Sequence, residues 1–138
     1  MDWLREQWAR RPWWMNLMLL FCAYMAVVYV PWDLFVKPAE VDEEVWFGVR
    51  FHGTAAKIAA VPHWIIYALG TVGFFGMKRW MHPWAAVYLA QVTIAFIVFP
   101  WLYGPGMPGS LIASIASGLV WGGITYAMWQ ARARFSED

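Results

Sequence analysis

The sequence predicts an all-α membrane protein, a four-transmembrane-helix bundle, and two observations carry this prediction. The 138 residues are 62% hydrophobic and only 14% charged, whereas a soluble domain usually devotes about a quarter of its residues to charge. No Asp, Glu, Lys or Arg occurs in 12–32, 58–77 or 80–130. A membrane span needs about 20 predominantly apolar residues, so the first two intervals suit one helix each and the third suits two.

The Gly- and Pro-rich segment 104–109 divides the long third interval where a tight turn is needed. The chain is short enough for one domain only. We therefore expect a single transmembrane domain over residues 1–138 with four spans, near 13–35, 57–78, 82–103 and 109–131.

Two short interfacial helices are expected outside the spans. Residues 2–11 carry acidic residues early, Arg10 and Arg11 late, and tryptophans that suit a lipid surface. In residues 42–51, Asp42 is expected to cap a helix that lies flat on the outer membrane face. The acidic residues at the start of that helix are interpreted as a solvated face.

The basic residues predict the orientation of the chain. With four spans, one side of the membrane receives most of them, namely Arg5, Arg10, Arg11, Lys78, Arg79, Arg132 and Arg134. Cytoplasmic loops carry an excess of Lys and Arg. Both termini are therefore expected in the cytoplasm, with a bacterial inner (plasma) membrane as the location. The chain is also rich in tryptophan, with 12 residues, most of them near predicted span ends, where indole rings prefer to lie.

The fourth span carries a stripe of small residues. Ser110, Ser114, Gly118 and Gly122 recur every four positions, and such a stripe lets two helix backbones approach closely in lipid. The main interpretation is helix packing within one bundle. The alternative is a seam between copies of the chain or with another membrane protein.

Polar groups inside the predicted spans are uncharged, and the deepest side-chain amide is Gln91. An interhelical hydrogen bond is its default role. Trp121 lies about halfway along the fourth span, where its indole N–H needs a partner or a cavity. Together with Tyr67 and Tyr126, these residues are candidates to line a pocket for an apolar ligand with one polar end.

Candidate catalytic groups are few. Asp33, near the outer end of the first span, or His63, toward the outer end of the second, is a candidate for an acid–base group at the outer rim. Asp33 is more simply an interfacial carboxylate, although it could meet Arg50 or Lys57. No ligand spacing for a metal and no motif for a cofactor is present, so neither is expected.

The layout resembles that of EXPERA-type sterol-binding proteins. The shared features are four spans, cytoplasmic termini and a run of Lys78, Trp80, Pro83 and Tyr88 at the start of the third span. The acidic pocket residues of that family have no counterpart here except Asp33. The glutamate that small multidrug exporters carry within their first span is missing.

Three functions follow as hypotheses. The first is a non-catalytic protein that binds lipid or another apolar ligand, or serves as accessory subunit of an inner-membrane complex. The second is a membrane enzyme or isomerase acting on a sterol- or lipid-like substrate, and the third is a small transporter or channel. Expected partners are membrane lipids, with further copies of the chain or a larger membrane complex as alternatives. A net charge of +1 gives no reason to expect nucleic acid.

Overall fold

The computed structural model of the chain describes residues 2–104 and 109–136. Its helices are α1 (Asp2–Ala9), α2 (Trp13–Tyr24), α3 (Val30–Phe35), α4 (Thr54–Gly76), α5 (Met81–Tyr103) and α6 (Ser110–Gln130), and its strands are β1 (Glu43–Trp46) and β2 (Val49–His52). Short 3-10 turns cover Ala39–Val41 and Ala131–Arg134. Most of the predicted turn over 104–109 lies outside the described residues.

Four helical segments are long and apolar enough to cross a membrane: Trp13–Phe35, Thr54–Gly76, Met81–Tyr103 and Ser110–Arg134. The four predicted spans are therefore confirmed to within a few residues at each end. The predicted N-terminal helix is also present as α1, where Trp3 and Trp8 are exposed.

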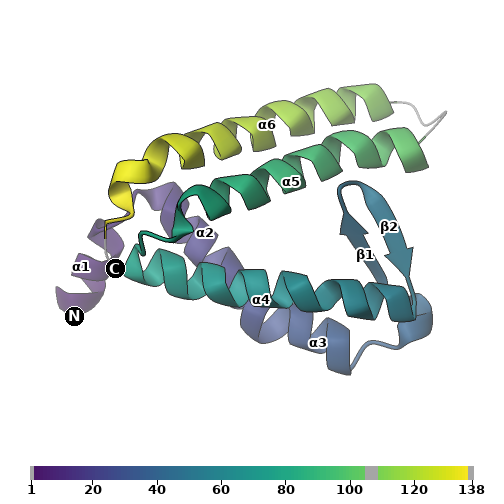
Figure 1. Cartoon of the computed structure of the whole chain (residues 1–138), viewed down its shortest axis with the longest axis horizontal. Coiled ribbons are helices and arrows are strands. Elements are labelled where there is room, and N and C mark those ends of the chain that lie inside the picture. Colours follow the sequence, from purple (N-terminus) through teal and green to yellow (C-terminus); the bar gives the residue numbers. More distant parts are fainter. Residues whose placement is uncertain (1, 105–108, 137–138) are drawn as a thin grey trace.

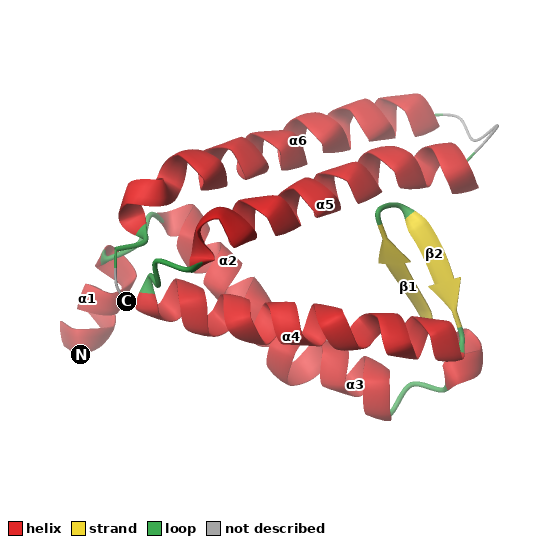
Figure 2. Cartoon of the chain, viewed as in Figure 1, coloured by secondary structure: helices red, strands yellow, loops and turns green. Residues whose placement is uncertain are grey.

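The four spans form two pairs that diverge (Figure 1). α6 packs along α5, and α4 packs along α2 and α3, whereas α4 and α5 contact each other over a much shorter stretch. α1 and the turn Ala131–Arg134 lie at the end where the pairs meet. At the opposite end the two strands stand between α4 and α5 (Figure 2).

The first span is continuous but not α-helical throughout. Between α2 and α3, Met25–Tyr29 forms a π-helical turn, in which the Val30 N–H donates to the Met25 carbonyl. Pro31 follows and has no N–H to continue this pattern. The Ala26 carbonyl instead accepts a 2.7 Å bond from Trp64 Nε1 of α4. The indole N–H of Trp64 thus provides the hydrogen-bond donor that the Ala26 carbonyl would otherwise lack, at the point where the first span changes from π-helix to α-helix.

The predicted interfacial helix over 42–51 is wrong, because these residues form an antiparallel hairpin with Trp46 paired to Val49 and Glu43 to His52. Phe47 and Gly48 make the turn, both with positive φ. Two-residue hairpin turns require this conformation, and glycine adopts it without steric cost. Valine and aromatic residues on both sides of the turn also favour strands.

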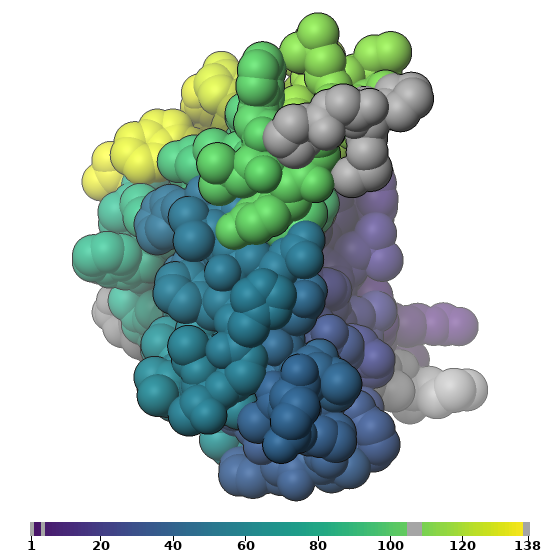
Figure 3. All heavy atoms as spheres, turned by 90° about the vertical axis from the view of Figure 1, so that its right-hand side faces the viewer, coloured from purple at the N-terminus to yellow at the C-terminus, as the bar shows by residue number. Residues whose placement is uncertain are grey.

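The hairpin turn rests directly on α5. A Cβ atom added to Gly48 would lie 2.6 Å from Val98 Cβ and 2.9 Å from the Phe99 nitrogen. Trp46 makes the second attachment, because its indole N–H donates a 3.0 Å bond to the Ala59 carbonyl of α4. The hairpin therefore bridges the two helix pairs, and its atoms form one surface with the ends of α5 and α6 (Figure 3).

The small-residue stripe of α6 contacts α5 within the same chain. Ser114 Oγ donates a 3.2 Å bond to the Ile97 carbonyl. A Cβ atom added to Gly118 would lie 3.1 Å from the Ile97 side chain, and one added to Gly122 would meet only Thr93, at 4.0 Å. The stripe thus allows α5 and α6 to approach each other closely, and the contact is tighter at Gly118 than at Gly122.

Arg11 ties the ends of α1, α2 and α4 together. Its guanidinium donates to the Phe74 and Phe75 carbonyls at 3.2 and 2.8 Å, and to Asn16 Oδ1 at 2.8 Å. It also donates to the Gln7 carbonyl at 2.7 Å. The last carbonyl groups of a helix have no N–H donor inside that helix. Arg11 therefore supplies hydrogen-bond donors to the carbonyl groups at the end of α4 from outside the helix.

Candidate functional site

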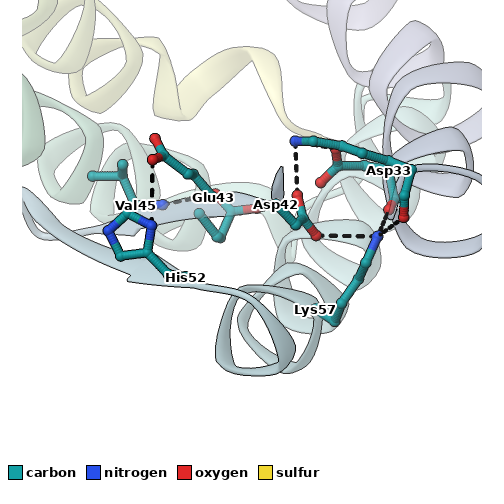
Figure 4. Close-up of polar contacts among 8 residues, drawn as sticks. Asp33, Asp42, Glu43, Val45, His52 and Lys57 are labelled. Carbon is teal, nitrogen blue, oxygen red and sulfur yellow. Dashed lines mark hydrogen bonds and ion pairs between the residues drawn. The ribbon is translucent and has the colours of Figure 1, made fainter. Parts of the chain in front are cut away.

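A cluster of two carboxylates and two lysines lies where the first span, the hairpin and α4 meet (Figure 4). Lys37 Nζ is 2.9 Å from Asp33 Oδ1 and 2.8 Å from Asp42 Oδ1. Lys57 Nζ is 3.1 Å from Asp42 Oδ2. Lys57 also donates to the carbonyls of Asp33 and Lys37. The cluster joins the end of the first span to the start of the hairpin and to α4.

Asp42 is the centre of this cluster and is only 1% exposed. Each of its two carboxylate oxygens faces one ammonium group, Oδ1 that of Lys37 and Oδ2 that of Lys57. Burial by itself would raise the pKa of Asp42, but the contacts with Lys37 and Lys57 outweigh burial and hold that pKa below its usual range. The contact with Asp42 in turn raises the pKa of Lys37. The interpretation of Asp42 as a solvated helix cap is therefore wrong.

A second polar cluster lies beside the first, around His63 of α4. His63 Nδ1 is 3.1 Å from Glu44 Oε1, and the same oxygen accepts the Val45 N–H at 3.0 Å. The His63 ring stacks on Trp46, with ring centroids 3.9 Å apart and planes 7° apart. The hairpin thus orients a buried imidazole with a carboxylate on one edge and an indole over its face.

Two tyrosines extend this second cluster toward α5. Tyr88 donates a 3.1 Å hydrogen bond to Tyr67, and both rings have centroids about 6 Å from that of His63, at 6.0 Å for Tyr67 and 5.9 Å for Tyr88. Gln91 lies one turn beyond Tyr88 and is buried, and its Oε1 atom has no hydrogen-bond partner among the described residues.

A groove of about 480 Å³ lies along the first half of α5 and the second half of α6. Its walls are almost wholly apolar, with the hydroxyl groups of Thr93, Thr125 and Tyr126 as the polar exceptions. Thr93 and Thr125 bond to each other at 3.0 Å. Gly122 forms part of the floor, and a Cβ atom there would meet only Thr93, so the groove owes its depth to the missing side chain.

No family model, curated protein or solved structure matches this chain. The site is therefore interpreted from its own geometry. Within the described residues, no group of three or more His, Cys, Asp or Glu side chains is arranged to hold a metal ion.

The four predicted pocket residues do not converge. Tyr126 lines the groove, and Trp121 stacks on Phe96, with ring centroids 5.3 Å apart. Tyr67 belongs to the His63 cluster. The two candidate acid–base groups have different partners, because Asp33 contacts Lys37 and His63 contacts Glu44. Glu44 and Tyr88 were not among the predicted site residues.

Proposed function

We propose that this membrane protein binds a lipid or another apolar molecule with one polar end, held along the groove of α5 and α6. The observation that carries this proposal is the apolar groove of about 480 Å³, whose lining includes the few hydroxyl groups of Thr93, Thr125 and Tyr126. Small-molecule sites have this character, mostly apolar with few polar groups that fix orientation. No catalytic step is required for this role.

The distribution of charge supports a bacterial inner membrane with both termini in the cytoplasm. The basic residues Arg5, Lys78 and Arg132 lie near the end of the structure that carries α1 and the C-terminal turn. Positive-inside asymmetry assigns that end to the cytoplasm. In this orientation the hairpin faces the outer side. An accessory role in a larger inner-membrane complex is compatible with this arrangement.

Gly122 allows a direct test of the groove. The substitution Gly122→Leu is expected to fill the groove and to lower photolabelling by a diazirine-bearing palmitic acid about tenfold, since loss of a buried apolar contact costs about 1–3 kcal/mol. The matched control is Gly123→Leu, because Gly123 is exposed and has open space around it. Mass spectrometry of the peptide that carries Tyr126 measures the labelling. Equal labelling of all three proteins contradicts the proposal.

A second function is favoured by the pair of Glu44 and His63. An imidazole oriented by a carboxylate is an arrangement that moves protons in general acid–base catalysis. His63 would take a proton from one carbon of an apolar substrate and return it to another, with Glu44 stabilising the transient imidazolium. The reaction is an isomerisation, which needs no oxidant or reductant.

For this second function, lipid extracts of cells that express the wild type are expected to contain a product of unchanged mass and shifted retention. His63→Gln should abolish that product, because glutamine cannot accept the proton. His52→Gln is the control, since His52 lies at the same end, is exposed and pairs with Glu43. Liquid chromatography with mass spectrometry makes the comparison. Identical lipid profiles for the wild type and His63→Gln exclude an isomerase role for His63.

A further inference from the structure

A second groove, of about 320 Å³, lies at the hairpin end of α5 and α6. Its lining combines one charged side chain, Arg50 of β2, with Phe99, Pro100, Tyr103, Gly104, Gly109, Ser110 and Ala113. The groove beside Gly122 shares none of these residues. The two grooves are therefore independent sites.

The two aromatic rings of the groove hold the Arg50 guanidinium in place. Its Cζ atom lies 4.6 Å from the ring centroid of Tyr103 and 5.0 Å from that of Phe99. The Tyr103 hydroxyl accepts the Arg50 backbone N–H at 2.9 Å. Rings that stack on the face of a guanidinium leave its N–H groups free at the edges. Arg50 is thus oriented without using up its donors.

The donors of Arg50 are incompletely satisfied. Its Nε atom is buried and has no partner among the described residues. Within residues 2–104 and 109–136, its carboxylate contact is with Glu43, at 3.5 Å, and the Glu43 side chain is 49% exposed. A pair of this length and exposure contributes little. The guanidinium therefore has room for a stronger acceptor.

The surroundings favour an anion from the lipid. α6 begins at Ser110 without a side-chain cap, so the positive end of its helix dipole lies at the same groove. Trp101, exposed at the end of α5, marks the headgroup level. Pro100, Ala113 and the aromatic rings give the groove apolar walls that suit the first methylene groups of an acyl chain.

We propose that Arg50 binds the phosphate of an anionic phospholipid in this groove, on the hairpin side of the membrane. The planar fork of a guanidinium matches two phosphate oxygens. Glu43 competes with the phosphate for the same guanidinium and weakens the binding. This proposal does not rest on ligand binding beside Gly122, and Gly122→Leu should leave it intact.

Native mass spectrometry tests the proposal with the full chain in nanodiscs that hold equal amounts of phosphatidylglycerol and monogalactosyldiacylglycerol with the same acyl chains. The wild type is expected to retain phosphatidylglycerol preferentially. Arg50→Gln should lower the ratio of retained phospholipid to glycolipid about tenfold, the size expected for a charged hydrogen bond. Glu43→Gln should raise the ratio. Arg5→Gln is the control for net charge, because Arg5 is exposed at the opposite end.

The two variants at the groove have opposite expected effects, which a purely structural role of Arg50 would not produce. If Arg50→Gln fails to fold, the ratio of retained phospholipid to glycolipid in Glu43→Gln still tests the proposal. An unchanged ratio in Arg50→Gln, or a lower ratio in Glu43→Gln, overturns the proposal. Displacement of the lipid by millimolar inorganic phosphate would indicate a site for free phosphate, and a mass increase of one chain would indicate a second copy. Either result also overturns it.

Discussion

Asp42→Asn is expected to destabilise the protein by about 3 kcal/mol at pH 7, since removal of one member of a buried ion pair typically costs about 3–5 kcal/mol. The substitution keeps the shape of the side chain but removes the charge that Lys37 and Lys57 both contact. The hairpin would lose its ion pair with the first span and one of its contacts with α4. Thermal unfolding in detergent, followed by circular dichroism, measures the loss.

The control for this substitution is Glu40→Gln, because Glu40 lies in the same loop and is exposed. The dependence on pH gives an independent check. The folded-state pKa of Asp42 lies below its ordinary value, so its stabilisation is fully present above about pH 4 and is lost as the pH falls below that value. The wild type should therefore lose more stability than Asp42→Asn between neutral pH and about pH 3. An equal loss in both proteins would show that Asp42 does not stabilise the fold in this way.

Arg11→Met is expected to cost about 3 kcal/mol or more, because each hydrogen bond to a charged group contributes about 1.5–3 kcal/mol. Methionine can fill the volume of the arginine stem but donates no hydrogen bond. The carbonyls of Phe74 and Phe75 would lose this donor. Asn16, buried beside them, would lose the donor to its Oδ1 atom.

Arg5→Met is the matched control for Arg11→Met, since Arg5 is an exposed arginine of α1. It removes the same charge and is expected to change the melting temperature by less than a degree or two, as surface substitutions usually change stability by under about 0.5 kcal/mol. Limited proteolysis gives a second measurement. In Arg11→Met, cleavage after Lys78 or Arg79 should accelerate, because the end of α4 loses its external donor. Unchanged cleavage there would contradict this account of Arg11.

The four spans were predictable because the membrane imposes a simple rule on the sequence. A charged side chain is costly in the bilayer core, so the intervals 12–32, 58–77 and 80–130 mark the spans without any knowledge of tertiary contacts. The same rule says nothing about which spans pair. The divergence of α4 and α5 depends on the hairpin between them, which the charge pattern does not reveal.

The hairpin was missed because Val41, Val45 and Val49 recur every four residues, which suits one face of a helix. A competing local signal was Gly48 between β-favouring residues, because glycine disfavours the interior of a helix and readily adopts the positive φ of a tight turn. Once these residues form strands, Glu44 reaches His63. The partners of His63 could therefore not be predicted, because they depend on the hairpin and on its position between α4 and α5.

The π-helical turn Met25–Tyr29 has a consequence for every residue after it in the first span. Each residue of an α-helix advances the direction of its side chain by about 100°. The extra residue in this turn therefore sets the rotation of α3 about the helix axis and changes the length of the span only a little. With one residue fewer, α3 as a whole would rotate relative to α4, and the carbonyls of Asp33 and Lys37 would turn away from the Lys57 ammonium group that they contact. A single inserted residue thus sets whether the outer end of this span is joined to α4 through Lys57.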